Sequence, residues 1–388
     1  MGRALGPSLR VPASDPPVRR GEESVGAVPG RPVASGVGGR VRPRIYLDHN
    51  ATAPLRPEAR QAMIDAMDLV GNPSSVHAEG RAAKGLIEAS RERLLEALGA
   101  TQADLIFTSG ATEAAALALE GRNLRSGGVE HEAVLAWTDA DLSVGRDGAV
   151  AVTDPASSTL QLANSESGIV QDLPPGLAVS DITQAVGRLP YAHDWTGTGM
   201  VFLSAHKFGG PKGVGALVVP RGHHLQSRLR GGGQEMGRRA GTENLMAVAG
   251  MAAAAQAALR DLADGVWEQV TQFRDILETA LEADSPDTIL VGRRSRRLPN
   301  TSLIVTPGWK GETQVMAMDL AGFAVSAGSA CSSGKARASN VLRAMGFDEG
   351  SAGCALRVSL GPATTEEEVL RFADAFTAAR RKQRSRAA

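Results

Sequence analysis

Cysteine is scarce in this chain of 388 residues, which contains only Cys331 and Cys354. Two cysteines are too few for a disulfide framework, and no cysteine or histidine cluster has the spacing of a metal site. A reducing, cytoplasmic compartment is therefore expected. Net charge is also absent, because 42 basic and 42 acidic residues cancel. This balance does not indicate a protein that binds nucleic acid or a membrane surface.

Long apolar runs are missing as well. The longest, residues 245–255, is rich in alanine and too short to span a bilayer, so we expect a core helix there. The first 43 residues lack aromatic side chains and any apolar period, and they combine frequent proline and glycine with arginine. Such a segment cannot bury enough surface to offset its ordering entropy, which predicts a disordered extension over residues 1–43. An arginine-rich transit peptide is the alternative.

The rest of the chain alternates short apolar runs with helical patterns. Strands are predicted at residues 104–108, 160–164, 177–181, 200–203 and 354–360. Helices are predicted at residues 57–70, 81–98, 114–122, 245–255, 266–283, 339–345 and 365–382. This order is typical of an α/β lobe followed by an α+β lobe.

Lys207 directly follows the buried run at residues 200–203 and precedes a loop of glycine and proline. Most lysines in loops are simply exposed. However, the ends of buried strands are where α/β sheets place their ligands, and a desolvated lysine there can lose its proton and attack a carbonyl.

Other junctions offer matching chemistry. The sequence SGATE, residues 109–113, opens a helix after a strand, where unpaired N–H groups can bind a phosphate, although the same residues also make an ordinary helix start. Asp181 ends an apolar run, and Cys331 lies in a small, polar loop, whereas Cys354 lies in an apolar strand as an inert thiol would. A lysine, an anion cradle, a carboxylate and a loop cysteine together suit pyridoxal phosphate.

Beyond these separate features, nine blocks of the sequence follow the order of a known family. They are YLDHNATAP, GNPSSVH, FTSGATE, EHEAV, DITQAVGRLP, SAHKFGGPKGVGAL, GGGQE with RRAGTEN, SAGSACSSG and LRVSLG. From about Ile45 to the helix at residue 365, the chain resembles the cysteine desulfurases of the class V aminotransferase family. The resemblance implies the pyridoxal phosphate-dependent transferase fold type I. Its large domain, residues 57–262, would hold a mostly parallel sheet between helices, and residues 44–56 with 263–384 would form a smaller α+β domain.

The resemblance also implies the roles of individual residues. The catalytic residues would be Lys207, which binds the cofactor and moves the α-proton, Cys331, whose thiolate attacks the substrate sulfur, and His131, which stacks on the ring. The cofactor-binding positions would be Ala111, Thr112, Ser165, Asp181, Gln184, Ser204, His206, Lys207 and Thr242. Within this set, Asp181 faces the ring nitrogen, Gln184 the ring hydroxyl, and Thr242 the phosphate of the partner subunit in a homodimer. Arg357 and Ser165 would bind the substrate, Arg357 through a bidentate fork to its carboxylate.

The implied activity is conversion of L-cysteine to L-alanine, with the sulfur kept as a persulfide and passed to an acceptor protein for iron–sulfur clusters or thiolation. The alternatives are another pyridoxal phosphate enzyme, such as a selenocysteine lyase, and a weakly active paralogue that binds cluster-assembly partners. Cys331 in its loop argues against a plain aminotransferase.

Two stretches depart from the family pattern. The family usually has a second asparagine, which contacts cofactor and substrate, where this chain has Ser165. In addition, only twelve residues, 165–176, connect two predicted parallel strands. They are too few to return along a strand and also form a helix, and Pro174-Pro175 opposes one. We therefore expect no crossover helix, and a sheet face that a partner protein covers.

Overall fold

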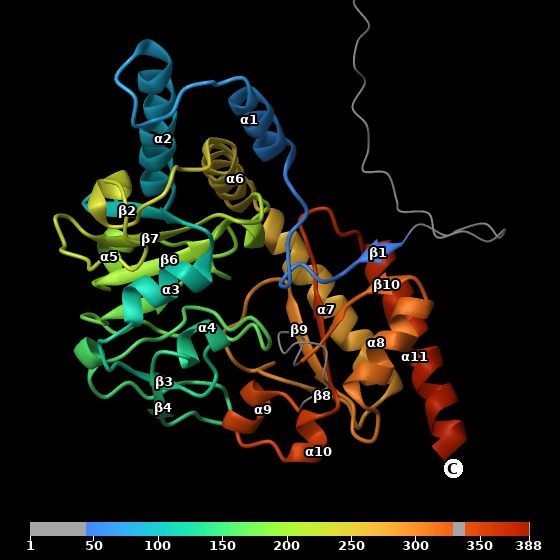
Figure 1. Ribbon diagram of the computed structural model, residues 1–388. Coiled ribbons are helices and arrows are strands. Elements are labelled where there is room, and N and C mark those ends of the chain that lie inside the picture. The colour runs from blue at the N-terminus through green and yellow to red at the C-terminus, as the bar shows by residue number, and fades with distance from the viewer. Residues whose placement is uncertain (1–43, 329–337, 388) are drawn as a thin grey trace, which may run out of the picture. The chain divides into compact units, whose positions relative to one another are not determined.

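The computed structural model describes residues 44–328 and 338–387 (Figure 1). The predicted disorder of residues 1–43 and the predicted nucleophile Cys331 both lie outside these residues.

A central sheet has the strand order β2-β7-β6-β5. Its strands are β2 (Ala103–Thr108), β7 (Gly215–Pro220), β6 (Met200–Ser204) and β5 (Val179–Asp181). β5 pairs parallel with β6, whereas β7 runs antiparallel to both β6 and β2. The C-terminal ends of β2, β5 and β6 therefore meet at one edge.

Two further strands extend this arrangement. β3 (Arg125–Gly127) and β4 (Asp139–Leu142) pair in parallel. The predicted strand at residues 160–164 is wrong, because no strand forms there; single parallel bridges just before it join Ser158 to Arg125 and Thr159 to Val179. These bridges connect β3 to β5 through the intervening segment.

Helices cover both faces of the central sheet, as Figure 1 shows. One face packs against α2 (Ala78–Ala97) and α6 (Leu245–Ala263), with α1 (Pro57–Met67) lying on α6. The other packs against α3 (Ala111–Leu119) and α4 (Glu132–Leu135). Side chains of β2 alternate accordingly: Leu105 and Phe107 join the first core and Ile106 the second. This two-sided burial explains the continuous apolar runs of the strands.

The C-terminal part is built on an antiparallel sheet in the order β11-β12-β9-β8. The strands are β8 (Ile289–Leu290), β9 (Thr301–Val305), β11 (Ser326–Ala327) and β12 (Ala355–Ser359), while β1 (Ile45–Tyr46) pairs with β10 (Phe323–Ala324). One core includes residues of α7 (Val266–Asp284), α8 (Gly311–Leu320) and α11 (Glu366–Ala387). A second hydrophobic core includes residues of α9 (Asn340–Ala344) and α10 (Glu349–Ala352). The domain boundary after residue 262 stays a prediction.

The short connection after Asn164 confirms one prediction and contradicts another. It contains no helix, as predicted. The prediction that one face of the sheet needs a partner protein to cover it is wrong, because the chain alone already buries that region: Leu160, Leu177 and Val179 are at most 1% exposed. The connection instead bonds to the C-terminal part: Val170 N–H donates to the Arg296 carbonyl at 2.8 Å, and Ile169 packs into the core beside α9.

Among the described residues, α6 is the single helix with the length and apolar composition of a membrane span. Ten of its residues are buried, and it packs against α1 and α2. These contacts are those of the core helix expected at residues 245–255. The remaining short helix, α5 (His193–Thr196), lies between β5 and β6 in the chain.

Candidate active site

A cavity of about 620 Å³ lies at the C-terminal edge of β2, β5 and β6. The structure brings most of the predicted site residues to its wall: Ala111, Thr112, His131, Ser165, Asp181, Gln184, Ser204, His206, Lys207 and Arg357. Thr242 does not line it, and Cys331 lies outside the described residues. The cavity therefore lies where the ends of parallel strands are expected to place a ligand, and the roles of its residues stay predictions.

Lys207 reaches this edge because β6 ends at Ser204 and a single 3-10 turn, Ala205–Lys207, follows. Its Nζ donates to the carbonyls of Asn50 at 2.8 Å and Ala51 at 3.0 Å. The same N-terminal segment holds the turn from outside, since Ala53 N–H donates to the His206 carbonyl at 2.8 Å. The amine therefore lies at the cavity wall and is hydrogen-bonded to two uncharged backbone carbonyls.

The first turn of α3 forms an anion cradle beside the lysine. The first N–H groups of a helix have no partner within the helix. The N-cap residue of α3 is Gly110, which has no side chain that could accept a hydrogen bond from them. Position 215, where β7 starts, requires glycine because an added Cβ would lie only 2.6 Å from the Gly110 carbonyl carbon. This close approach fixes the helix start against the sheet, next to Ser204 and His206.

His206 is neutral at physiological pH. Burial, followed by the nearby Lys207 and Lys212 charges, lowers its pKa to about 4. Its Nδ1 lies 3.2 Å from the Thr52 hydroxyl. A neutral ring keeps one N–H, which suits donation to a phosphate oxygen.

Two carboxyl groups lie at this part of the site: the half-buried Asp181 in the cavity wall and the buried Glu130 close to it. Burial raises the pKa of Asp181, although the Thr183 hydrogen bonds and the His131 and Lys207 charges act in the opposite direction. Its Oδ1 accepts from Thr183 N–H at 2.8 Å. Glu130, which the sequence did not single out, has a pKa raised to about 8 by burial and by the Asp181 charge. Glu130 Oε1 accepts from Gln161 N–H at 2.6 Å, while its Oε2 is buried without a hydrogen-bond partner among the described residues.

His131 caps α4, because its Nδ1 accepts from Ala133 N–H at 3.1 Å. In a neutral ring this bond puts the proton on Nε2. The imidazole is therefore held in one orientation at the cavity wall by the helix that follows it.

Arg357 projects from β12 and is 3% exposed. Its Nη2 donates to Asp48 Oδ1 at 2.8 Å and its Nη1 to the Ser165 carbonyl at 3.1 Å. Its Nε is buried and has no hydrogen-bond partner in the part of the chain that the structure describes. The guanidinium is thus held from behind by Asp48 while it lines the cavity, which suits recognition of an anionic ligand.

Ser165 lines the cavity, but the neighbouring asparagine does not. Asn164 Oδ1 instead accepts from the N–H groups of Glu166 and Ser167, and its Nδ2 donates to the Val129 carbonyl. Asn164 therefore stabilises the turn after it, and its side chain is not a substitute for an amide at position 165.

Thr242 is exposed in the glycine-rich stretch of residues 231–244, which is called the glycine-rich loop below. The loop is fixed to its own chain by Glu235, whose carboxylate pairs with Arg91. Arg239 adds an ion pair with Glu113 at the start of α3, 2.8 Å long. The loop therefore lies near the rim of the cavity, with Thr242 outside the cavity wall.

Four residues near the cavity escaped the sequence analysis: Asp48, Asn50, Glu130 and Arg188. Asp48 and Asn50 lie in the matched block YLDHNATAP, and Glu130 in EHEAV, yet no spacing rule assigns them a role. Asp48, Asn50 and Arg188 contact segments more than one hundred residues away, as in the Asp48–Arg357 pair and the bond from Arg188 to Asn50. Only the folded chain reveals such partners.

Comparison with known proteins agrees with this geometry. The family model for aminotransferase class-V matches residues 45–147 and 160–372. The chain belongs to the class-V aminotransferase family. A cysteine desulfurase of Cereibacter sphaeroides is 39% identical over 85% of this chain and 94% of its own length. The predicted resemblance and the fold class are thereby confirmed.

Solved structures of the family superpose on most of the chain. A NifS-like protein from Rickettsia africae gives a TM-score of 0.78 at 29% identity, covering 86% of this chain and 99% of its own. A structure described as SspA in complex with cysteine gives 0.67 at 25% identity, covering 83% and 100%.

Members of this family use pyridoxal phosphate, and the cavity has the groups that this cofactor requires. The start of α3 offers N–H donors for a phosphate, Lys207 offers an amine for an aldehyde, and Asp181 offers a carboxylate for a ring nitrogen. The residues present therefore fit the cofactor.

Proposed function

We propose that this protein is a cysteine desulfurase that converts L-cysteine to L-alanine and keeps the sulfur as a persulfide on Cys331. The observation that carries the proposal is the convergence of Lys207, Asp181, Arg357 and the start of α3 on one cavity. Family membership supplies the reaction class. Cysteine is the ligand named for one of the similar structures.

In this proposal each residue has a defined task. The α3 N-terminus with Ala111, Thr112, Ser204 and His206 holds the cofactor phosphate, and Gln184 contacts the ring hydroxyl. Asp181 contacts the ring nitrogen, and His131 stacks on the ring and moves protons. When bound, pyridoxal phosphate supplies an electron sink for charge at the substrate α-carbon.

The substrate is positioned by its carboxylate, which Arg357 binds while Asp48 keeps the guanidinium in place. Ser165 lies at the same wall and contacts substrate or cofactor. The Lys207 amine takes the α-proton. The Cys331 thiolate then attacks the substrate sulfur: an S–S bond forms, the carbon–sulfur bond breaks, and its electron pair stays with the carbon, which gains a proton to become alanine.

We further propose a homodimer in which Thr242 of each chain completes the cavity of the other. Thr242 is exposed and does not line its own cavity, and the glycine-rich loop that carries it is anchored at the start of α3. Exposed Met236 and Met246 flank Thr242 in the chain and would be covered by a second copy. We place the enzyme in the cytoplasm, where it would pass the persulfide sulfur to an acceptor protein for iron–sulfur cluster assembly or thiolation.

The test is turnover of cysteine by the purified, cofactor-loaded protein with a thiol reductant. Alanine and sulfide should form in equal amounts. Cys331→Ser should lower both by orders of magnitude and keep the cofactor, whereas Cys354→Ser, the matched control, should keep both. Release of pyruvate in place of alanine, or persulfide on Cys354 by mass spectrometry, would contradict the proposal.

A further inference from the structure

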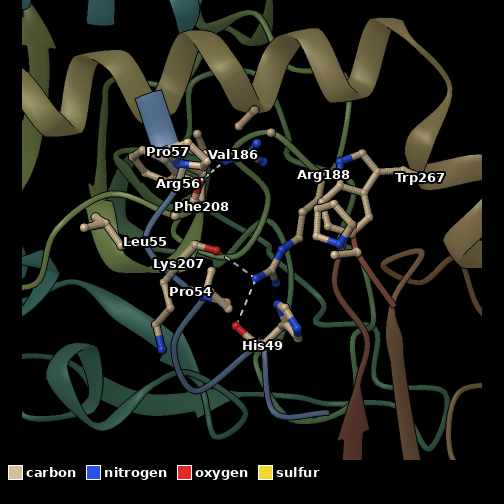
Figure 2. Close-up of a pocket in the computed structure, with 16 residues that line it drawn as sticks. His49, Pro54, Leu55, Arg56, Pro57, Val186, Arg188, Lys207, Phe208 and Trp267 are labelled. Carbon is tan, nitrogen blue, oxygen red and sulfur yellow. Dashed lines mark hydrogen bonds between the residues drawn. The ribbon is translucent and has the colours of Figure 1, made fainter. Parts of the chain in front are cut away.

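Arg188 is a buried arginine directly behind Lys207, and the reaction described above assigns it no task. It is 3% exposed and lies on the segment that follows β5. It lines a second cavity of about 180 Å³, whose wall shares Lys207 with the active-site cavity. Figure 2 shows the guanidinium between the backbone carbonyls of Lys207 and His49, while the Lys207 amine points away from it.

Each acceptor that Arg188 contacts is uncharged, and each belongs to the wall or the support of the active site. Its Nη1 donates to Gln184 Oε1 at 2.6 Å and to Asn50 Oδ1 at 2.9 Å. Its Nη2 donates to the Lys207 carbonyl at 2.9 Å and to the His49 carbonyl at 3.3 Å. One planar group therefore links the segment after β5, the turn after β6 and the N-terminal segment.

Burying a charge among neutral acceptors is costly. Burial, together with the nearby Arg357 charge, lowers the pKa of Arg188 to about 9. Stability alone does not explain a charge at this position, since replacing a buried ionic group with apolar side chains often leaves the stability of the fold unchanged or increases it. The geometry of the donors offers a better reason.

The hydrogen bonds fix the orientation of the Gln184 amide. Oε1 accepts from Arg188, so the Nε2 edge is turned toward Asn50, whose carbonyl accepts at 3.0 Å. Because an amide nitrogen has two N–H groups, one remains for a ligand in the cavity that Gln184 lines. A flipped amide would present an acceptor in the same place.

We propose that Arg188 is a positioning residue that orients the Gln184 amide as a donor toward the cofactor and fixes the backbone of Lys207. The proposal rests on the proposed function only in taking pyridoxal phosphate as the ligand of the cavity. A lysine cannot replace it, because one ammonium nitrogen does not span the acceptors that the planar fork reaches.

The test compares the pH midpoint of the visible absorbance of the bound cofactor in Arg188→Met, Arg188→Lys and wild type. Loss of the oriented donor disfavours the deprotonated chromophore, so the midpoint should rise by about half to one pH unit in Arg188→Met, the equivalent of one hydrogen bond. Arg188→Lys keeps the charge and should shift the midpoint in the same direction. We also expect kcat for cysteine to fall about tenfold or more, with KM changed much less.

A double-mutant cycle with Gln184→Ala separates an effect of Arg188 through the Gln184 amide from a direct effect of the Arg188 charge on the cofactor. If Arg188 acts through Gln184, Arg188→Met should shift the midpoint little in the Gln184→Ala background. An undiminished shift there, or a wild-type midpoint in both Arg188 variants, would overturn the proposal. If Arg188→Met does not fold, the midpoint of Arg188→Lys, measured with and without Gln184→Ala, is sufficient to test the proposal.

Arg380→Met is the matched control, because Arg380 is also buried, at 4% exposed, but bonds to Asp287, Gln383 and the Pro307 carbonyl. It should lower stability and leave the midpoint unchanged. A protein that shows the cofactor titration without cysteine turnover would refute the proposed function while the midpoints still test Arg188.

Discussion

Replacing Glu235 with alanine should destabilise the chain and release the glycine-rich loop. The Glu235 side chain is 1% exposed. Its carboxylate accepts from Arg91 Nη1 at 2.8 Å, Arg91 Nη2 at 3.1 Å and Phe107 N–H at 3.0 Å. Removing it leaves the guanidinium, itself only 11% exposed, without this buried counter-ion. Breaking a buried ion pair in this way costs about 3–5 kcal/mol.

The assay is urea unfolding of the cofactor-free variant, followed by circular dichroism. Glu120→Ala is the matched control, because the Glu120–Arg228 pair lies near the surface and such pairs contribute about 0–1 kcal/mol. Trypsin should also cut faster after Arg238 and Arg239 in Glu235→Ala, since the loop loses its buried anchor and the ion pairs of Arg238 with Asp104 and of Arg239 with Glu113 are nearer the surface. A loss in Glu235→Ala no larger than that in Glu120→Ala, with unchanged trypsin cutting, would refute this reasoning.

Three further predictions follow from the site. Glu130 has a folded pKa raised to about 8, so wild type should lose stability relative to Glu130→Gln as pH rises from 4.5 to 8, and equal melting temperatures across that range would contradict this. Cys354→Ser should lower the melting temperature modestly and leave cysteine turnover intact, because this thiol is buried in the core near α9. Thr242→Ala should keep the dimer in light scattering and weaken cofactor binding; a fully active monomer would oppose the shared site.

The position of the candidate site could be predicted because it depends on local patterns. Lys207 was expected just after the buried run that forms β6, and Asp181 at the end of the preceding run, which forms β5; both line the cavity. The start of α3 could be predicted for the same reason, because the residues that open the helix directly follow the apolar run that forms β2. In each case the strand and its ligand-bearing end are adjacent in sequence.

The supporting contacts were not predictable, because they join distant segments. Asp48 meets Arg357, and Arg188 meets Lys207 and Asn50, through positions that no periodicity relates. The error over the sheet face had a similar origin. The short length of residues 165–176 correctly excluded a helix, but the sequence did not reveal that Ile169 packs into the C-terminal core.

The most direct test of the central claim is to locate the cofactor on the chain. The protein is loaded with pyridoxal phosphate, reduced with borohydride, digested and analysed by mass spectrometry. The cofactor mass should lie on Lys207, and Lys207→Ala should lose both this modification and sulfide release, while Lys212→Ala, which removes the other lysine of the cavity wall, keeps the modification. Cofactor mass on a different lysine, or an unchanged visible absorbance in Lys207→Ala, would contradict the account.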